Sequence, residues 1–122
     1  MNLTKQELTE ILTETLNAFR EEFDGDITAS RILTLLAVSD HPGMQQIDVA
    51  DYVKGLSASA ISRNLVDWGD HTTARKPGPG FIEQRPDPMY RRRNLVYPTT
   101  KALHWLEQLT GRINAKLGKT AR

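Results

Sequence analysis

The segment DPMYRRRNLVYPTTKA, residues 87–102, constrains the fold of this chain more than any other. Three consecutive arginines follow a proline-rich tip and precede a short apolar run. Pro98 ends a strand at this point, and Thr99 or Thr100 can cap the helix that follows. We therefore predict the second strand of a basic β-hairpin that leads directly into a helix. A solvated basic loop is the alternative interpretation.

Charge is distributed unevenly along the chain, although the formal net charge of the 122 residues is only +1. Residues 1–53 contain three bases and ten acids, a charge of −7, whereas residues 54–122 contain 13 bases and five acids, a charge of +8. Locally clustered bases favour contact between the second half and a polyanion. An internal electrostatic match between the two halves is the alternative.

Composition excludes several classes of protein and site. The chain contains no cysteine, which excludes disulfides and thiolate chemistry and fits a reducing cytoplasm. No apolar run approaches the roughly 20 residues of a membrane span, and the first residues lack a signal-peptide pattern. The three histidines have no metal-ligand spacing, and no catalytic or phosphate-loop motif occurs. We expect a single cytoplasmic domain that is not an enzyme and holds no metal or cofactor.

Capping signals and helical periodicity predict two helices in the first 40 residues. Thr4 and Glu7 form a capping box at the start of the first helix, which runs to about residue 23. The second helix begins at Thr28 and is apolar on most sides. We expect this second helix at the centre of the core.

The next two helices have the pattern of a helix-turn-helix, because a turn of about four residues containing Gly55 joins them. The shorter helix covers roughly residues 46–54, and Ser57 caps the following one. The side chains that we expect to face inward from the shorter helix are Ile47, Val49, Ala50 and Val53.

One face of the helix after Ser57 is predicted to be buried, because Ile61, Leu65 and Trp68 recur at helical spacing. Ser59, Arg63 and Val66 then point away from the core, with Ser62 on the flank and Asn64 nearer the core edge. An arginine on such a face can reach the O6/N7 pair of a guanine in a major groove. An ordinary surface helix is the alternative.

Turn-forming residues fill the segment 69–80, which we predict to be a mobile loop. Its two basic residues, Arg75 and Lys76, either contact phosphate or lie in a solvent-exposed, disordered loop. The first strand of the hairpin follows at residues 81–84, with Arg85 near the tip. A last helix runs from about residue 100 to residue 117 with an apolar stripe along it.

From about residue 27 to residue 109 the chain resembles the MarR (multiple antibiotic resistance regulator) family of winged-helix transcription regulators. The matching positions in the helix-turn-helix are Val49-Ala50, Gly55-Leu56-Ser57 and Ser59-Ala60-Ile61-Ser62-Arg63. The matching positions in the wing and the helix after it are Gly80-Phe81-Ile82, Asp87, Arg91-Arg92, Val96, Thr99 and Lys101. Tyr90 departs from the pattern, because the family usually has an Asp before the two arginines. Gln84 replaces a frequent wing arginine.

The resemblance implies a mainly α fold with a small β-hairpin, a winged helix-turn-helix with N- and C-terminal dimerisation helices. We predict one winged-helix domain over residues 1–122, with a dimerisation helix at 1–23, a core at 27–98 and a C-terminal helix at 99–122. The implied function is sequence-specific binding of double-stranded DNA by a homodimeric repressor that reads an inverted repeat. The alternative is a winged-helix module that binds a protein in transcription or replication machinery.

Two sets of residues carry these predictions, and the resemblance adds a small aromatic effector in a cleft between the dimerisation helices and the DNA-binding part. The predicted DNA-binding residues are Ser57, Ser59, Ser62, Arg63, Asn64, Arg75, Lys76, Arg85, Arg91, Arg92 and Arg93. The predicted dimerisation residues are Leu8, Ile11, Leu12, Leu16, Leu109, Ile113 and Leu117.

Overall fold

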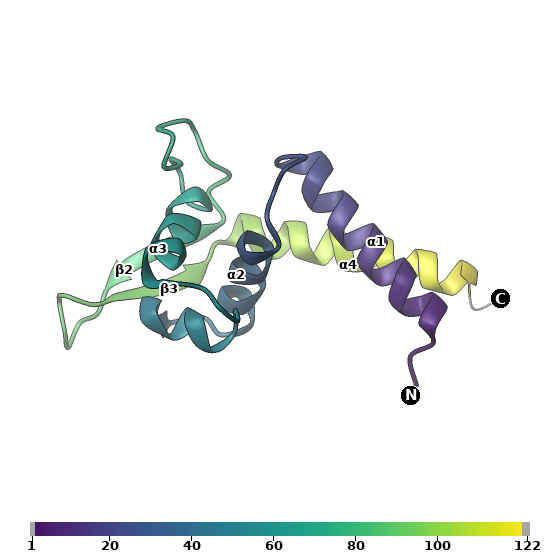
Figure 1. Ribbon diagram of the computed structural model, residues 1–122, viewed down its shortest axis with the longest axis horizontal. Helices are drawn as coiled ribbons and strands as arrows, with labels where there is room; N and C mark the ends of the chain where they lie inside the picture. The colour runs from purple at the N-terminus through teal and green to yellow at the C-terminus, as the bar shows by residue number, and fades with distance from the viewer. Residues whose placement is uncertain (1, 121–122) are drawn as a thin grey trace. The chain divides into compact units, whose positions relative to one another are not determined.

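The computed structural model describes residues 2–120, with side chains described as far as residue 118. Its fold is mainly helical with one small antiparallel sheet, as predicted (Figure 1). The elements in chain order are α1 (Lys5–Glu22), α2 (Ala29–Asp40), β1 (Met44–Gln45), the 3-10 helix η1 (Gln46–Asp51), α3 (Ala58–Asp67), β2 (Ile82–Pro86), β3 (Asn94–Pro98) and α4 (Thr100–Thr120). No helix in the described part of the chain is both long and apolar enough to cross a membrane.

The chain divides into two compact units. Residues 28–103 form one unit, called here the winged-helix unit, and residues 1–27 with 104–122 form the terminal unit. The first turn of α4 belongs to the winged-helix unit because Thr99 ties it there. The Thr99 hydroxyl donates to the Gly80 carbonyl at 2.7 Å and accepts from the Ala102 amide at 3.2 Å. Thr99 is therefore the cap of α4, and Ala102 is fully buried.

The predicted starts of the first two helices are confirmed by their caps. Thr4 accepts from the Glu7 amide at 3.0 Å, and the Glu7 carboxylate accepts from the Thr4 amide at 3.0 Å, which completes the capping box. Thr28 accepts from the Arg31 amide at 3.2 Å at the start of α2. Each cap satisfies amides that have no partner within the helix.

The core of the winged-helix unit forms around α2, whose Leu35 and Val38 are fully buried. Trp68, at the end of α3, stacks on Phe81 with ring centroids 5.7 Å apart. The Trp68 indole also donates to the Arg31 carbonyl of α2 at 2.7 Å, which satisfies its one polar group inside the core. These contacts hold α3 in a fixed orientation on α2.

The sheet has the strand order β1-β3-β2, and both pairs are antiparallel. The central strand β3 places Val96 opposite Met44 on one side and opposite Gln84 on the other. The β2–β3 hairpin was predicted, but β1 was not. A strand of two residues is too short to produce an alternating pattern in the sequence.

The prediction for the third helix was wrong about the type of helix and about which side chains it buries. It is a 3-10 helix that ends at Asp51, and Ile47 is 69 % exposed, with Ala50 exposed as well. Only Val49 and the following Val53 are buried. A 3-10 helix has three residues per turn, so Ile47 and Ala50 share a face that excludes Val49. A 3.6-residue period therefore assigned two side chains to the wrong face.

In the terminal unit, α1 packs against the part of α4 from residue 104 onward. The Trp105 ring lies 4.8 Å from the Phe19 ring and 5.1 Å from the Phe23 ring, between centroids. Arg112 donates to the Glu14 carboxylate at 2.8 Å, and Lys116 lies 3.5 Å from the same group. Aromatic packing and this ion-pair cluster join the two helices.

Candidate nucleic-acid interface

The buried side chains of α3 determine which face of the helix is exposed to solvent. Ile61, Leu65 and Trp68 are almost completely buried, as predicted. Ser57 caps the helix by accepting from the Ala60 amide at 3.2 Å. Gly55 lies in the left-handed region at φ +73°, where glycine is favoured, and makes the turn between η1 and α3. The opposite side of α3 is therefore turned to solvent.

Three predicted contact residues lie on that solvent side. Ser59, Ser62 and Arg63 are all exposed, whereas Val66 is half-buried. The Ser59 hydroxyl lies 3.3 Å from that of Ser57, so the two form a polar cluster at the start of the helix. A small polar surface with one arginine can approach base edges without a steric barrier.

Asn64 requires a correction, because it points into the core. It is 8 % exposed, and its amide donates to the Thr34 hydroxyl at 3.3 Å and the Ser30 hydroxyl at 3.4 Å. Thr34 in turn donates to the Ser30 carbonyl at 2.8 Å. These bonds engage the Asn64 side chain with α2, and we leave it out of the interface.

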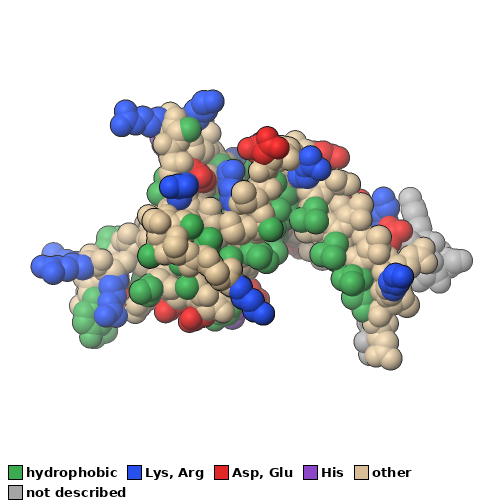
Figure 2. All heavy atoms as spheres, viewed as in Figure 1, with side chains coloured by type: hydrophobic (Ala, Val, Ile, Leu, Met, Phe, Trp, Pro, Cys, Tyr) green, Lys and Arg blue, Asp and Glu red, His purple; other side chains and the backbone are tan. Residues whose placement is uncertain are grey.

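The wing is the β2–β3 hairpin, and its tip is closed by backbone hydrogen bonds. The Asp87 amide donates to the Arg93 carbonyl at 2.8 Å, and the Arg93 amide donates to the Tyr90 carbonyl at 2.8 Å. Arg91, Arg92 and Arg93 are all exposed at this end. Figure 2 shows Lys and Arg side chains gathered at the free end of the hairpin.

Arg85 is the next-to-last residue of β2 and so lies near the tip, as the sequence predicted. Its guanidinium donates to the Glu83 carboxylate at 2.8 Å and lies 4.3 Å from the Tyr97 ring centroid. The hydrogen bond from Arg85 lowers the pKa of Glu83, and the Glu83 carboxylate raises the pKa of Arg85. Because Arg85 already has an anionic partner, it is a weaker candidate for phosphate than the arginines at the tip.

The segment 69–80 connects α3 to β2 and contains several local hydrogen bonds, and its mobility stays a prediction. His71 pairs with Pro77 in an antiparallel bridge, and the Thr72 amide donates to the Lys76 carbonyl at 2.8 Å. Thr73 is held at the end of α3, because its hydroxyl donates to the Asp67 carboxylate at 2.8 Å. Arg75 and Lys76 are exposed on this loop, and Arg75 adopts φ +61° at the turn.

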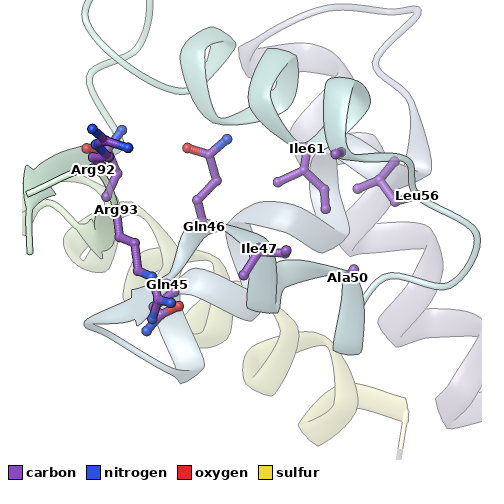
Figure 3. A pocket seen from close by; sticks show the side chains of 10 residues that line it. Gln45, Gln46, Ile47, Ala50, Leu56, Ile61, Arg92 and Arg93 are labelled. Carbon is purple, nitrogen blue, oxygen red and sulfur yellow. The ribbon is translucent and has the colours of Figure 1, made fainter. Parts of the chain in front are cut away.

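A groove of about 470 Å³ separates α3 from the wing arginines (Figure 3). The residues that line it are Gln45, Gln46, Ile47, Ala50, Leu56, Ala58, Ile61, Arg92, Arg93 and Asn94. Its apolar side chains come from η1, α3 and the turn between them, and its two cationic groups come from the wing. Sequence reasoning missed this groove, because only folding brings the segments 45–61 and 92–94 together.

A helix-turn-helix followed by a wing, with a sheet of order β1-β3-β2, defines a winged-helix protein. No family model matches the sequence, and no curated protein matches it. Solved structures do match the fold. The structure of MarR is similar with a TM-score of 0.58 and 22 % identity, over 95 % of this chain and 81 % of that one.

Two further solved structures were determined with a bound partner. The MepR–DNA complex of S. aureus has a TM-score of 0.63 and 22 % identity, over 95 % of this chain and 82 % of that one. The PcaV transcriptional regulator of Streptomyces coelicolor, in complex with its natural ligand, has a TM-score of 0.58 and 21 % identity, over 96 % and 83 %. The predicted resemblance to the MarR family is thus confirmed for the fold.

Proposed function

We propose that this protein is a transcription regulator that binds double-stranded DNA in a sequence-specific manner. The observation that carries the proposal is a single winged-helix unit with an exposed Arg63 on α3 and three exposed arginines on its wing. The crystal structure of MepR bound to DNA supports the same use of this fold.

In the proposed complex, α3 occupies a major groove and the wing reaches the adjacent minor groove. Arg63 is placed to donate two hydrogen bonds to a guanine, with Ser59 and Ser62 beside it. A sugar–phosphate strand must run between two adjacent DNA grooves. We place that strand across the mouth of the groove between α3 and the wing, within reach of Arg92.

The proposed assembly is a homodimer that reads an inverted repeat and represses by occupying a promoter. Leu8, Leu12 and Leu16 are 46 %, 49 % and 43 % exposed on α1, which is a large apolar surface to leave in water. Ile11, Ile113 and Leu117 are half-buried in the same terminal unit, whereas Leu109 is buried within it. A second copy of this unit would cover the exposed leucines. The ligand complex of PcaV supports a small-molecule effector for this chain as well.

The alternative function is a protein-interaction module, and the exposure of Ile47 in an apolar groove is the observation that favours it. Selection of bound duplexes from a random pool, with the full-length protein, decides between the two. We expect enrichment of one motif that occurs twice as an inverted repeat. No enriched sequence, together with a stoichiometric protein partner recovered from the same lysate, would favour the interaction module.

A further inference from the structure

The tip of the wing presents large apolar side chains to solvent. Met89 is 83 % exposed and Tyr90 is 57 % exposed. Figure 2 shows hydrophobic side chains beside the basic ones at the free end of the hairpin. Exposed apolar groups are common on protein surfaces when single, but two adjacent ones at the end of a projecting hairpin are unusual.

Local hydrogen bonds fix the backbone of the tip. The Met89 amide donates to the Asp87 carboxylate at 2.9 Å, and Pro88 fixes the backbone between them. The backbone bonds between Asp87 and Arg93 and between Arg93 and Tyr90 close the loop behind Met89. The Arg93 guanidinium lies 4.7 Å from the Tyr90 ring centroid, so Tyr90 is held against the arm of the hairpin.

The charges around the tip indicate which kind of ligand would cover Met89. Arg91, Arg92 and Arg93 follow it directly, and the sequence contains no acid from Pro88 to Leu106. An apolar side chain followed by three cations fits a ligand with an anionic edge and an apolar interior, and the one acid beside it, Asp87, accepts a hydrogen bond from the Met89 amide. The minor groove of DNA has that structure, because phosphates border it and base pairs stack inside it.

We propose that Met89 is a wedge that inserts between two base pairs in the minor groove, while Arg91 and Arg92 neutralise the flanking phosphates. This proposal rests on the proposed function and adds a second way in which the protein recognises DNA sequence. Apolar side chains placed in this way partly unstack a base step and kink the duplex.

The wedge gives the wing a preference that arginines alone do not provide. Pyrimidine–purine steps such as TA and CA unstack more easily than the steps of an A-tract. We therefore expect a flexible step at a fixed distance from the bases read by α3. At this step the protein would recognise the DNA sequence by how easily the base pairs unstack, with no hydrogen bond to a base edge.

The test uses the full-length protein and a duplex recovered by selection, with 2-aminopurine replacing the adenine of the flexible step. Wild-type protein is expected to raise the 2-aminopurine fluorescence, because unstacking relieves quenching. Met89→Ser is expected to abolish that rise and to weaken binding roughly tenfold, the change that corresponds to burial of one methionine side chain. Met89→Leu should retain both properties.

Two controls separate the wedge from the proposed function itself. Leu33→Ser, which changes an exposed leucine on α2, should alter neither fluorescence nor affinity. Replacing the flexible step by an A-tract should weaken the wild type and leave Met89→Ser unaffected. One outcome overturns the wedge alone. If Arg92→Ala loses affinity, but Met89→Ser has the same affinity and gives the same 2-aminopurine fluorescence as the wild type, the wedge is wrong and the DNA-binding function stands. If the wild type binds no duplex, both proposals are wrong.

Discussion

Adjacent residues on α3 have different roles, and the difference lies in where each side chain points. Arg63 is exposed, whereas Asn64 is buried and donates to two hydroxyls of α2. Asn64→Ala should lower the free energy of unfolding by about 1–3 kcal/mol, because a buried hydrogen-bonding group is removed from its partners. Arg63→Ala should change it by less than about 0.5 kcal/mol. Urea denaturation of both variants checks this, and equal destabilisation would contradict the assignment.

The ion pair on the wing makes a prediction about pH. The pKa of Glu83 is lowered by the hydrogen bond from Arg85, so the pair stabilises the fold above the pKa of an unfolded glutamate. This contribution is lost as the pH falls through the lowered pKa of the folded state. Both groups are exposed, so the effect on overall stability is small.

A carbon-detected NMR titration of the Glu83 carboxyl group measures this directly. The midpoint in the wild type should lie below that of an ordinary glutamate and should return toward it in Arg85→Gln. An identical midpoint in both proteins would show that the pair does not persist in solution.

At the scale of the elements, the base of the 69–80 loop depends on backbone that only glycine adopts easily. Gly80 has φ +66°, and a Cβ added to it would lie 3.0 Å from the Asp70 carboxylate. Gly80→Ala should therefore cost about 1–2 kcal/mol of stability. Gly111→Ala is the matched control, since its Cβ would meet no atom within 4 Å and it lies within α4. That change should stabilise the protein by roughly 0.5–1 kcal/mol.

Thermal unfolding of the two alanine variants should give shifts of opposite sign. A stabilised Gly80→Ala protein would contradict the described loop, because it would mean that residue 80 does not need a left-handed backbone. A destabilised Gly111→Ala protein would contradict the continuity of α4 through that position.

Elements with local signals could be predicted from the sequence, and elements that depend on distant pairing could not. The caps at Thr4, Thr28 and Ser57 and the strand before Pro98 are encoded by neighbouring residues. In contrast, β1 exists only through its pairing with β3, and the 3-10 helix begins at the residue directly after β1. The sequence showed neither feature, so the α-helical period that we assumed for residues 46–54 was wrong.

The candidate site follows the same rule. The arginines at 91–93 and Arg63 could be located from charge and helical phase alone. Helical phase also placed Asn64 nearer the core edge, but its bonds to Thr34 and Ser30 could not be predicted, because these partners lie 30 and 34 positions away along the chain. The groove between α3 and the wing was missed for the same reason, since its walls come from two separate segments.

At the scale of the whole molecule, the proposed function involves two copies of the chain. Leu12 is 49 % exposed at the middle of the apolar stripe on α1. We expect a dimer in sedimentation equilibrium at micromolar concentration, and a monomer for Leu12→Glu, because a buried unpaired carboxylate opposes association. Leu33→Glu, on α2 of the winged-helix unit, should remain dimeric. A wild-type monomer at that concentration would contradict this assembly.

The central claim, that α3 reads DNA sequence and the wing holds the backbone, is tested most directly by comparing two arginine variants. Affinity is measured for the wild type, Arg63→Ala and Arg92→Ala on the selected duplex and on random duplex at several salt concentrations. Arg63→Ala should lose roughly 1–3 kcal/mol on the selected duplex and less on random DNA. Arg92→Ala should weaken binding to both and reduce the salt slope by about one unit for each lost phosphate contact. Unchanged affinity in both folded variants would contradict the claim.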